Sequence, residues 1–445
     1  MTSPDQATVP GPATRDNHRW RALVVLCFVH FMLVLDDTVV NVALPSVRDD
    51  LGFSTAGLAW VVNAYFLSFG GLLLLFGRAG DLLGRRRLFL SGVALFATAS
   101  LACGLAQEPW QLVVGRFGQG TGAAMTSPAA LALITLLFPG ERERARALSI
   151  WGASAGLGGT TGLVISGALT GLASWRWIFF VNLPIAALAL VLIPRLVAES
   201  RARQPERLDV AGAVLGTAAL VSLVYGLLEA AATGWGRTGT TVPLVLAAAL
   251  AGAFAAVEAR APAPLVPRSF LASRVRVLAN AISLPFTAAF FSMSFLLMLH
   301  MQTVLGYDPL TAGLAYLPYG AGILIGVAVS SVALPRIGVR ATLVSAFLVA
   351  AAGLLLLAGV SPDDHYATDV LPGLLVAALG SGVGFAALTV AAMTGTTRDD
   401  AALGSAVLTT VQQVGGAVGL SVLAGLAVQR SDSLAPRTEP LRALT

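Results

Sequence analysis

The feature that most constrains this chain is a series of apolar stretches, each about 20 residues long, that recurs from Trp20 to about residue 428. An α-helix of that length crosses the roughly 30 Å hydrocarbon core of a bilayer and satisfies its own backbone polar groups there. Only 11% of the 445 residues are charged, whereas soluble domains average about 25%. The sequence therefore predicts an all-α polytopic membrane protein.

The spacing of the apolar stretches predicts about thirteen membrane spans. Their expected ranges are 20–45, 57–77, 86–106, 110–133, 145–171, 176–197, 209–231, 241–258, 277–304, 309–333, 341–360, 370–394 and 401–428. Two polar segments, 199–209 and 258–276, read as linkers that set the seventh and eighth spans apart from the larger blocks on either side.

Arginine is concentrated in every second loop. The Arg-rich segments precede the first span and recur at 85–87, 141–146, 201–207, 268–276, 336–340 and 398, while the loops between them hold few Arg. Because cytoplasmic loops carry the excess of basic residues, we expect the N-terminus in the cytoplasm. The Lys-free, Ala- and Gly-rich composition is typical of GC-rich bacterial genomes, so we expect a multi-pass protein of the bacterial inner (plasma) membrane.

Composition also excludes several classes of function. Without any Lys, the chain cannot form a GxxxxGKS/T phosphate loop or a Schiff-base lysine. Cys27 and Cys103 both lie inside apolar spans, where core packing is the better interpretation. The arginines are dispersed between spans rather than gathered in a basic patch. We therefore expect no enzymatic activity, no metal, no cofactor, no nucleotide and no nucleic-acid partner.

Two adjacent acids, Asp36 and Asp37, interrupt the first apolar stretch within "LDDTVVNVAL", residues 35–44. A charged, unpaired carboxylate costs several kcal/mol in hydrocarbon, so at least one acid should carry a proton part of the time or pair with a cation. Asn41 and His30 share the helix face of Asp37. His30 could relay protons, although an inert histidine inside the bundle is the alternative. Simple capping or hydrogen bonding within the bundle is the alternative for the acids.

An arginine, Arg116, lies inside the fourth expected span in "GRFGQGTGAA", residues 115–124. A cation at this depth requires an acidic partner elsewhere in the bundle, unless its side chain extends to the interface. Gln119 is one turn further along the same helix and is a candidate for lining a polar cavity.

The segment "GRAGDLLGRRR", residues 77–87, ends the second span at the expected cytoplasmic edge. A topogenic anchor would explain its arginines but neither its acid nor its glycines. The candidate functional residues of this segment are Gly77, Gly80, Asp81, Gly84, Arg85 and Arg86.

Small residues recur at four-residue spacing in the fifth span, at Gly158, Gly162 and Ser166, and Gly167 follows directly. This spacing predicts a face for close helix packing. Three further intramembrane polar residues, His300, Gln302 and Gln412, could line a cavity, although hydrogen bonding between helices explains them equally well.

With these motifs together, nearly the whole chain from Trp20 to about residue 429 resembles the major facilitator superfamily and, more closely, its 14-helix drug:proton antiporter family. "LDDTVVNVALP" is similar to the first-helix signature LDxTIVNVALP, with Asp36 at the signature acid and Asp37 at the variable position. The other matching segments are "GRAGDLLGRRRL" at 77–88, "RFGQGTGAA" at 116–124, "SWRWIFFVNLP" at 174–184 and "LGYDPLTAGLAYLP" at 305–318. The resemblance implies that the first of these segments, at 77–88, is a gating loop.

Two departures from that family matter. The fifth-span motif GPxxGG is replaced by "GLVISG" at 162–167, and no fourteenth span follows residue 428. The resemblance implies a cytoplasmic tail at 1–19, expected to be disordered, and an N-terminal six-helix bundle at 20–198. It further implies a linker region with two inserted helices at 199–276, a C-terminal bundle at 277–429 that is one helix short, and a polar tail at 430–445.

The function implied by the resemblance is export of hydrophobic or cationic drugs in exchange for protons, by alternating access and without a cofactor. Asp36, Asp37, Arg116 and Asn41 would couple protons to substrate. We expect a monomer whose partners are the substrate, protons and the lipid bilayer. Uptake or exchange of a metabolite is an alternative that the altered fifth-span motif keeps open, and a truncated, non-transporting membrane protein is another.

Overall fold

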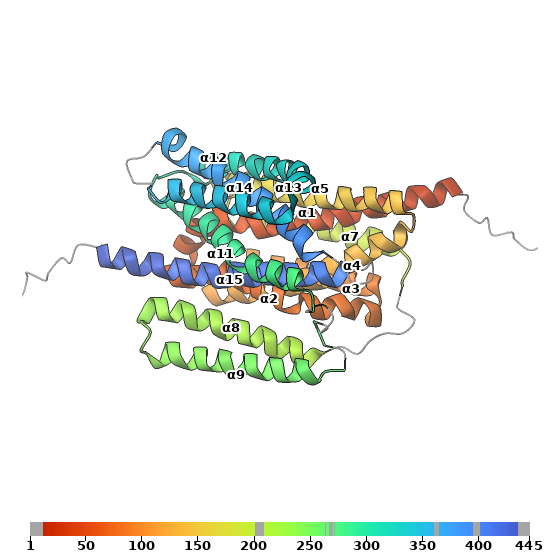
Figure 1. Cartoon of the computed structure of the whole chain (residues 1–445), viewed down its shortest axis with the longest axis horizontal. Helices are drawn as coiled ribbons and strands as arrows, with labels where there is room; N and C mark the ends of the chain where they lie inside the picture. Colours follow the sequence, from red (N-terminus) through yellow and green to blue (C-terminus); the bar gives the residue numbers. More distant parts are fainter. Residues whose placement is uncertain are drawn as a thin grey trace, which may run out of the picture.

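The computed structural model describes residues 12–200, 209–262, 264–266, 270, 272–359, 365–394 and 401–434. Throughout these ranges the regular secondary structure is helical. The long helices lie side by side along the long axis of the molecule (Figure 1). The predicted all-α class is therefore confirmed.

The helices form two halves and an inserted pair. The N-half contains α1 (Pro12–Leu51), α2 (Thr55–Leu83), α3 (Arg85–Gly104), α4 (Pro109–Leu137), α5 (Glu141–Leu172), α6 (Trp177–Phe180) and α7 (Asn182–Leu196). The inserted pair is α8 (Val210–Thr233) and α9 (Thr238–Arg260), which lie together along one edge (Figure 1). The C-half contains α11 (Arg274–Thr303), α12 (Pro309–Ala315), α13 (Leu317–Leu357), η1 (Tyr366–Val370), α14 (Leu371–Ala392) and α15 (Ala401–Leu434).

The first and last helices extend beyond the ranges expected from sequence. Helix α1 begins at Pro12 rather than near residue 20, and α15 continues to Leu434. The rest of the two expected tails, residues 1–11 and 435–445, and most of the first linker, residues 201–208, lie outside the described residues.

Twelve helical stretches among the described residues are long and apolar enough to cross a membrane, one fewer than the thirteen expected. The difference lies in the stretch Pro309–Leu357, which has 49 residues. At about 1.5 Å per residue, a straight helix of that length would be more than twice as long as the bilayer core is thick. Helical geometry is broken inside it at Gly338, where φ is 78° and ψ is 166°.

The chain reverses at Gly338, because both arms of α13 pack on the same part of α14. Gly322 in the first arm lies against Ala378, and Gly353 in the second arm lies against Ala377. A reversal is consistent with the positions of the ends, since α1 begins at one end of the molecule and α15 finishes at the other (Figure 1). The two arms correspond to the expected spans 309–333 and 341–360. The count of twelve treats these two spans as one continuous stretch.

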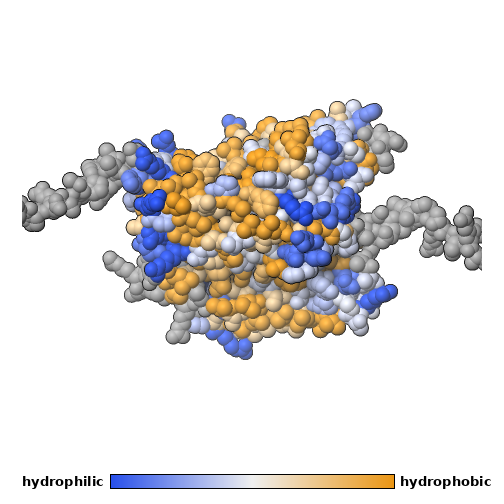
Figure 2. Space-filling view, turned by 180° about the vertical axis from the view of Figure 1, so that it is seen from behind, coloured by the Kyte–Doolittle hydropathy of each residue, from blue (hydrophilic) through white to orange (hydrophobic). Residues whose placement is uncertain are grey.

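Hydropathy divides the surface into a belt and two ends. Apolar side chains cover the middle of the molecule, and hydrophilic ones gather at both ends of its long axis (Figure 2). Large apolar residues of the described helices, such as Val245, Leu348 and Leu355, are exposed. Exposed apolar surface of this extent is costly in water and is satisfied by lipid. The belt therefore marks the part of a multi-pass protein that lies in the bilayer.

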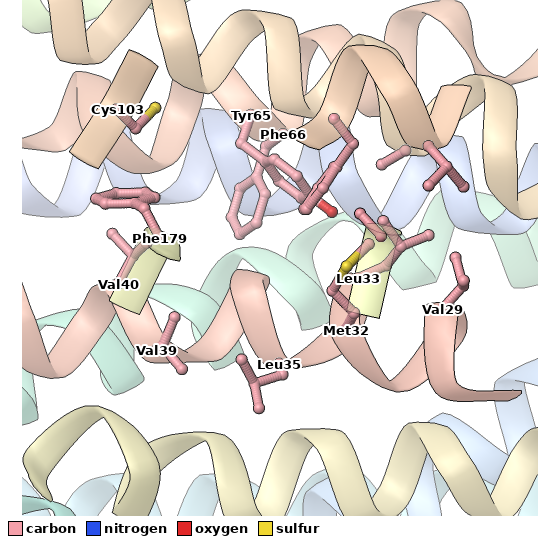
Figure 3. Packing of buried hydrophobic residues seen from close by; sticks show 14 of the residues in the cluster. Val29, Met32, Leu33, Leu35, Val39, Val40, Tyr65, Phe66, Cys103 and Phe179 are labelled. Atoms are coloured by element: carbon pink, nitrogen blue, oxygen red, sulfur yellow. The ribbon is translucent and has the colours of Figure 1, made fainter. Parts of the chain in front are cut away.

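Helix α1 runs through the apolar core of the N-half (Figure 3). Its residues Val29, Leu33 and Val40 are buried there together with Phe66 of α2 and Phe179 of α6. Cys27 and Cys103 are buried free thiols in the same core, which is the placement expected from the sequence. Tight packing on both sides of α1 fixes the direction in which each of its few polar side chains points.

Candidate functional site

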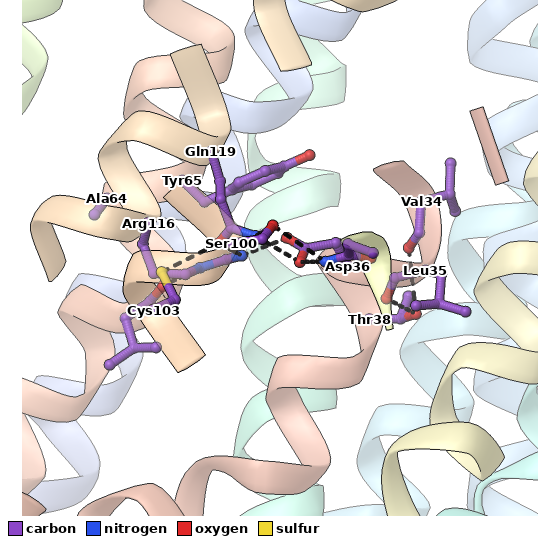
Figure 4. A network of polar contacts seen from close by, with 12 residues as sticks. Val34, Leu35, Asp36, Thr38, Ala64, Tyr65, Ser100, Cys103, Arg116 and Gln119 are labelled. Atoms are coloured by element: carbon purple, nitrogen blue, oxygen red, sulfur yellow. Dashed lines mark hydrogen bonds and ion pairs between the residues drawn. The ribbon is translucent and has the colours of Figure 1, made fainter. Parts of the chain in front are cut away.

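The carboxylate of Asp36 is fully buried in the N-half, where side chains from α4 and α7 donate to it (Figure 4). Arg116 Nη1 lies 2.5 Å from its Oδ2. Gln119 Nε2 and Asn182 Nδ2 each donate to Oδ1 at 2.8 Å. Charge-assisted hydrogen bonds of this kind are roughly twice as strong as neutral ones. Asp36 is therefore held in one position by its partners.

The guanidinium of Arg116 is also fully buried, which excludes the alternative that it extends to the membrane interface. Its Nε donates to the Val61 carbonyl of α2 at 2.9 Å, and its Nη1 donates to Gln119 Oε1 at 3.0 Å. The ring of Tyr65 lies 4.5 Å from the guanidinium carbon. The structure thus brings Arg116 together with an acid of the bundle, as the sequence led us to expect.

Ser100 of α3 completes this polar network, which we define as Asp36, Ser100, Arg116, Gln119 and Asn182. Gln119 Nε2 donates to Ser100 Oγ at 2.7 Å. Sequence reasoning placed Gln119 in a cavity, but the structure buries it in the network because it lies one helical turn from Arg116. Ser100 and Asn182 were missed. Asn182 had a signal, since it is a polar residue within the quoted segment "SWRWIFFVNLP".

Asp37 points away from the polar network, because consecutive side chains on an α-helix are about 100° apart. It lines a cavity of about 360 Å³ between the two halves. The N-half contributes residues of α1, α2, α4 and α5 to the lining, and the C-half contributes residues of α11, α14 and α15. We call this space the central cavity.

The lining of the central cavity is mainly apolar and aromatic. Its aromatic side chains are Tyr65, Phe69, Trp151, Phe291 and Phe385. Its polar or ionisable side chains, besides those of Asp37 and Tyr65, are His30, Ser127, Ser405, Thr409, Gln412 and Gln413. A cavity of this size with a few polar groups among apolar walls is typical of sites for drug-sized molecules.

The central cavity lies nearer to one end of the long axis of the molecule than to the other. Its lining lies toward the end where α1 begins and where α2 is followed by Arg85–Arg87, which we call the Arg-rich end. On α15, which finishes at the opposite end, the lining residues run from Ser405 to Gln413, close to the start of the helix at Ala401, and on α5 the lining residue Trp151 lies close to the start of the helix at Glu141.

Toward the opposite end the two halves are in direct contact. Gln302 Nε2 of α11 donates to the Val42 carbonyl of α1 at 2.8 Å. Asn63 Nδ2 of α2 donates to Ser421 Oγ of α15 at 2.9 Å. Gly167 of α5 packs against Leu310 of α12. These three contacts close the space between the halves on that side.

The remaining polar candidates separate into two groups. His30 and Gln412 line the central cavity as considered from the sequence. His30 Nδ1 lies 3.1 Å from Ser154 Oγ, and its ring stacks on Trp151 at 3.8 Å between centroids. Asn41, His300 and Gln302 lie outside the lining of this cavity, and Gln302 instead joins the two halves at the closed end.

The small residues of α5 pack against α1. Gly158 lies against the Phe31 carbonyl, Gly162 against Thr38, and Ser166 Oγ donates to the Val39 carbonyl. A Cβ at Gly158 would lie 2.9 Å from the Phe31 oxygen, so the close approach requires glycine. This face holds α1, and with it both acids, in a fixed register against α5.

The junction between α2 and α3 is contacted by an acid that sequence reasoning missed, Glu199, which follows α7. Gly84 has φ 104°, a conformation that favours glycine, and α3 begins directly after it. Glu199 accepts hydrogen bonds from the backbone N–H groups of Arg86 and Arg87, both at 3.1 Å. The Arg86 guanidinium donates to the Val197 carbonyl at 3.0 Å. The end of α7 is thereby fastened to the start of α3.

The other candidates of this loop are placed less fully. Gly77 and Gly80 lie in the last two turns of α2, and Gly80 approaches Leu88 and Arg85. The side chain of Asp81 lies outside the described residues, so its pairing with Arg85 stays a prediction.

A model of the Major Facilitator Superfamily matches residues 26–420. The chain belongs to this superfamily. Among relatives, the puromycin resistance protein pur8 of Streptomyces alboniger is 41% identical over 426 residues, which is 94% of this chain and 83% of the relative. The cephamycin export protein CmcT of Amycolatopsis lactamdurans is 38% identical over 427 residues, which is 95% of this chain and 88% of the relative.

The fold agrees with the superfamily assignment. A bacterial homolog of the human lysosomal transporter Spinster, solved in an inward-facing and unoccupied conformation, superposes with a TM-score of 0.62 at 17% identity. The match covers 91% of this chain and 81% of that one. As a member of the major facilitator superfamily, the chain is a transporter and not an enzyme.

Proposed function

We propose that this protein exports hydrophobic small molecules, cationic ones and antibiotics among them, in exchange for protons by alternating access. The observation that carries the proposal is the central cavity, which lies between two halves that are joined by hydrogen bonds toward the end opposite the Arg-rich end. Rocking the halves would expose such a cavity to one side of the membrane at a time. The named activities of the relatives, puromycin resistance and cephamycin export, support a drug-sized cargo.

The charge at the two ends of the molecule indicates which side of the membrane the cavity faces. The Arg-rich end belongs in the cytoplasm of a bacterial cell by the positive-inside rule, together with the N-terminus. The cavity lies toward that end, so this conformation would receive a substrate from the cytoplasm or from the inner leaflet. Breaking the contacts of Gln302, Asn63 and Gly167 would then open the other side.

The polar network supplies a mechanism for proton coupling. Protonation of Asp36 would remove the charge that balances Arg116 in a buried site. An uncompensated buried cation is strongly unfavourable, so the network would have to rearrange around it. Because Asp36 is on α1, which also lines the cavity, this rearrangement would reach the substrate site. The proton gradient would be the energy source, no cofactor is needed, and one chain would suffice.

Everted membrane vesicles test the direction of transport. With an acidic lumen, antiport predicts that puromycin or a lipophilic dye accumulates inside the vesicles and that a protonophore abolishes the accumulation. Movement of the compound out of the lumen together with protons would instead establish symport, the uptake alternative. Insertion and folding are checked by detergent extraction and size-exclusion chromatography, so that a lack of movement for every compound would count against transport.

A further inference from the structure

We propose that Asp37 is the cation-recognising group of the central cavity, and that the preferred substrates are lipophilic molecules with one positive charge, such as amines and quaternary cations. The inference deepens the proposed function and rests on it for the role of the cavity. The two neighbouring acids then have different roles: Asp37 binds the substrate, and Asp36 belongs to the polar network.

The first observation is an unused hydrogen-bond acceptor. Asp37 Oδ1 is buried, and it has no hydrogen-bond partner among the described residues. A buried acceptor without a partner is unfavourable, and for a charged group the penalty is larger. Because Asp37 lines the central cavity, a ligand in that cavity could supply the missing donor.

The second observation is the balance of charge around Asp37. Arg116 is the nearby cation, but its guanidinium is paired with Asp36 at 2.5 Å. Among the described residues that line the cavity, Asp37 is the only acid and none is an arginine. The three groups together therefore have one negative charge in excess when both acids are ionised. A cavity of this kind attracts a cation and repels an anion.

The third observation is the aromatic character of the walls. Tyr65 and Phe69 of α2 and Trp151 of α5 line the cavity on the N-half side, and Phe291 and Phe385 line it on the C-half side. Aromatic faces attract organic cations through their quadrupole, by about 2 kcal/mol where the site is desolvated. The rings would hold the apolar body of the molecule while Asp37 binds its charge.

Asp36 cannot take this role in the described conformation. Arg116, Gln119 and Asn182 donate hydrogen bonds to its two carboxylate oxygens. Its side chain is fully buried on the side of α1 that faces α4 and α7. The inference therefore assigns the contact with substrate to the acid at the variable position of the first-helix segment, not to the acid at its signature position.

A pair of ions with the same shape and opposite charge tests the inference. Tetraphenylphosphonium and tetraphenylborate have nearly the same size, so their relative affinity reports the charge preference of the site. Binding of each radiolabelled ion is measured to the full-length protein in nanodiscs, with empty nanodiscs subtracted. The wild type should prefer the cation. Replacing Asp37 with Asn should weaken cation binding at least about tenfold, as expected for loss of a desolvated charge pair.

Matched variants control for folding and for the neighbouring acid. Asp37→Glu keeps the charge, so its affinity for the cation should stay within about threefold of the wild-type affinity. That change is much smaller than the loss of about tenfold expected for Asp37→Asn. Asp37→Asn should leave borate binding no weaker than in the wild type, which shows that the cavity is intact. Equal affinity for both ions in the wild type would overturn the inference, as would a loss of cation preference in Asp36→Asn but not in Asp37→Asn.

Transport assays separate this inference from the proposed function. If the wild type exports drugs but binds the two ions without charge preference, the transport function stands and the role of Asp37 is wrong. If the ions bind with the expected preference while no compound drives proton exchange, the cation site stands and the proposed antiport is wrong.

Discussion

At the scale of single residues, the protein separates two adjacent acids by turning them in different directions on α1. Asp36 meets Arg116, Gln119 and Asn182 inside the N-half, whereas Asp37 faces the central cavity. The same helix can therefore carry one acid that responds to protons through a fixed network and one that is accessible to a ligand.

The buried ion pair predicts non-additive effects on stability. Asp36→Asn or Arg116→Gln alone leaves a partner uncompensated and should lower the free energy of unfolding by about 3–5 kcal/mol. The double variant removes both charges and should be clearly less destabilised than the sum of the two single variants. Thermal unfolding in detergent checks this, and strictly additive losses would show that the two charges do not depend on each other.

Sequence reasoning predicted part of this site and missed part of it. A lone arginine in an apolar span demands an acid, so a partner for Arg116 could be expected from the chain alone. The amide of Asn182 and the hydroxyl of Ser100 carry no charge. Hydrogen bonds within their own helices could offset the free-energy cost of placing them in the membrane equally well. Only the packing of α3 and α7 beside α1 shows that they reach Asp36 and Gln119.

At the scale of helices, the packing of α5 on α1 predicts which glycines tolerate a methyl group. Gly158→Ala should cost about 1 kcal/mol or more, because the new Cβ would lie 2.9 Å from the Phe31 oxygen. Gly152→Ala in the same helix is the matched control. A Cβ there has no atom within 4 Å, and alanine favours the helix by up to about 1 kcal/mol. Equal melting temperatures for the two variants would contradict this packing.

The junction of α7 and α3 gives a second prediction for helices. Glu199→Ala removes the acceptor for two N–H groups at the start of α3 and should destabilise the protein by about 1 kcal/mol. Glu143→Ala is the control, because Glu143 forms an exposed ion pair with Arg19 at 3.3 Å. Such pairs contribute little, about 0–1 kcal/mol. A larger loss of stability for Glu143→Ala than for Glu199→Ala would show that Glu199 does not fasten these helices.

The sequence predicted the helices better than their connections. Apolar length places nearly every span, because the thickness of the bilayer sets it. The reversal at Gly338 has only a short polar segment, so the two arms of α13 join into one continuous stretch there. Glu199 lies in a polar segment that read only as a linker, and nothing in its neighbours indicated that it would meet the start of α3.

At the scale of the whole molecule, alternating access requires that the closed end opens. Asn63→Cys with Ser421→Cys, in a chain whose two native cysteines are replaced by Ser, places thiols at a contact between the halves. We expect oxidation to form the cross-link and to stop transport, and a reducing agent to restore it. Continued transport by fully cross-linked protein would mean that the two halves need not separate there.

A cross-link within the inserted pair controls for oxidation itself. Gly226 of α8 packs against Leu244 of α9, so the Gly226→Cys with Leu244→Cys pair should also cross-link. It joins two helices outside both halves and should leave transport intact.

The most direct test of the account is proton release from acidified everted vesicles when a lipophilic drug is added. We expect drug-dependent release in the wild type and none in Asp36→Asn. Asp37→Asn should keep release with uncharged substrates and lose most of it with cations. Wild-type rates in Asp36→Asn would contradict the assignment of proton coupling to the polar network.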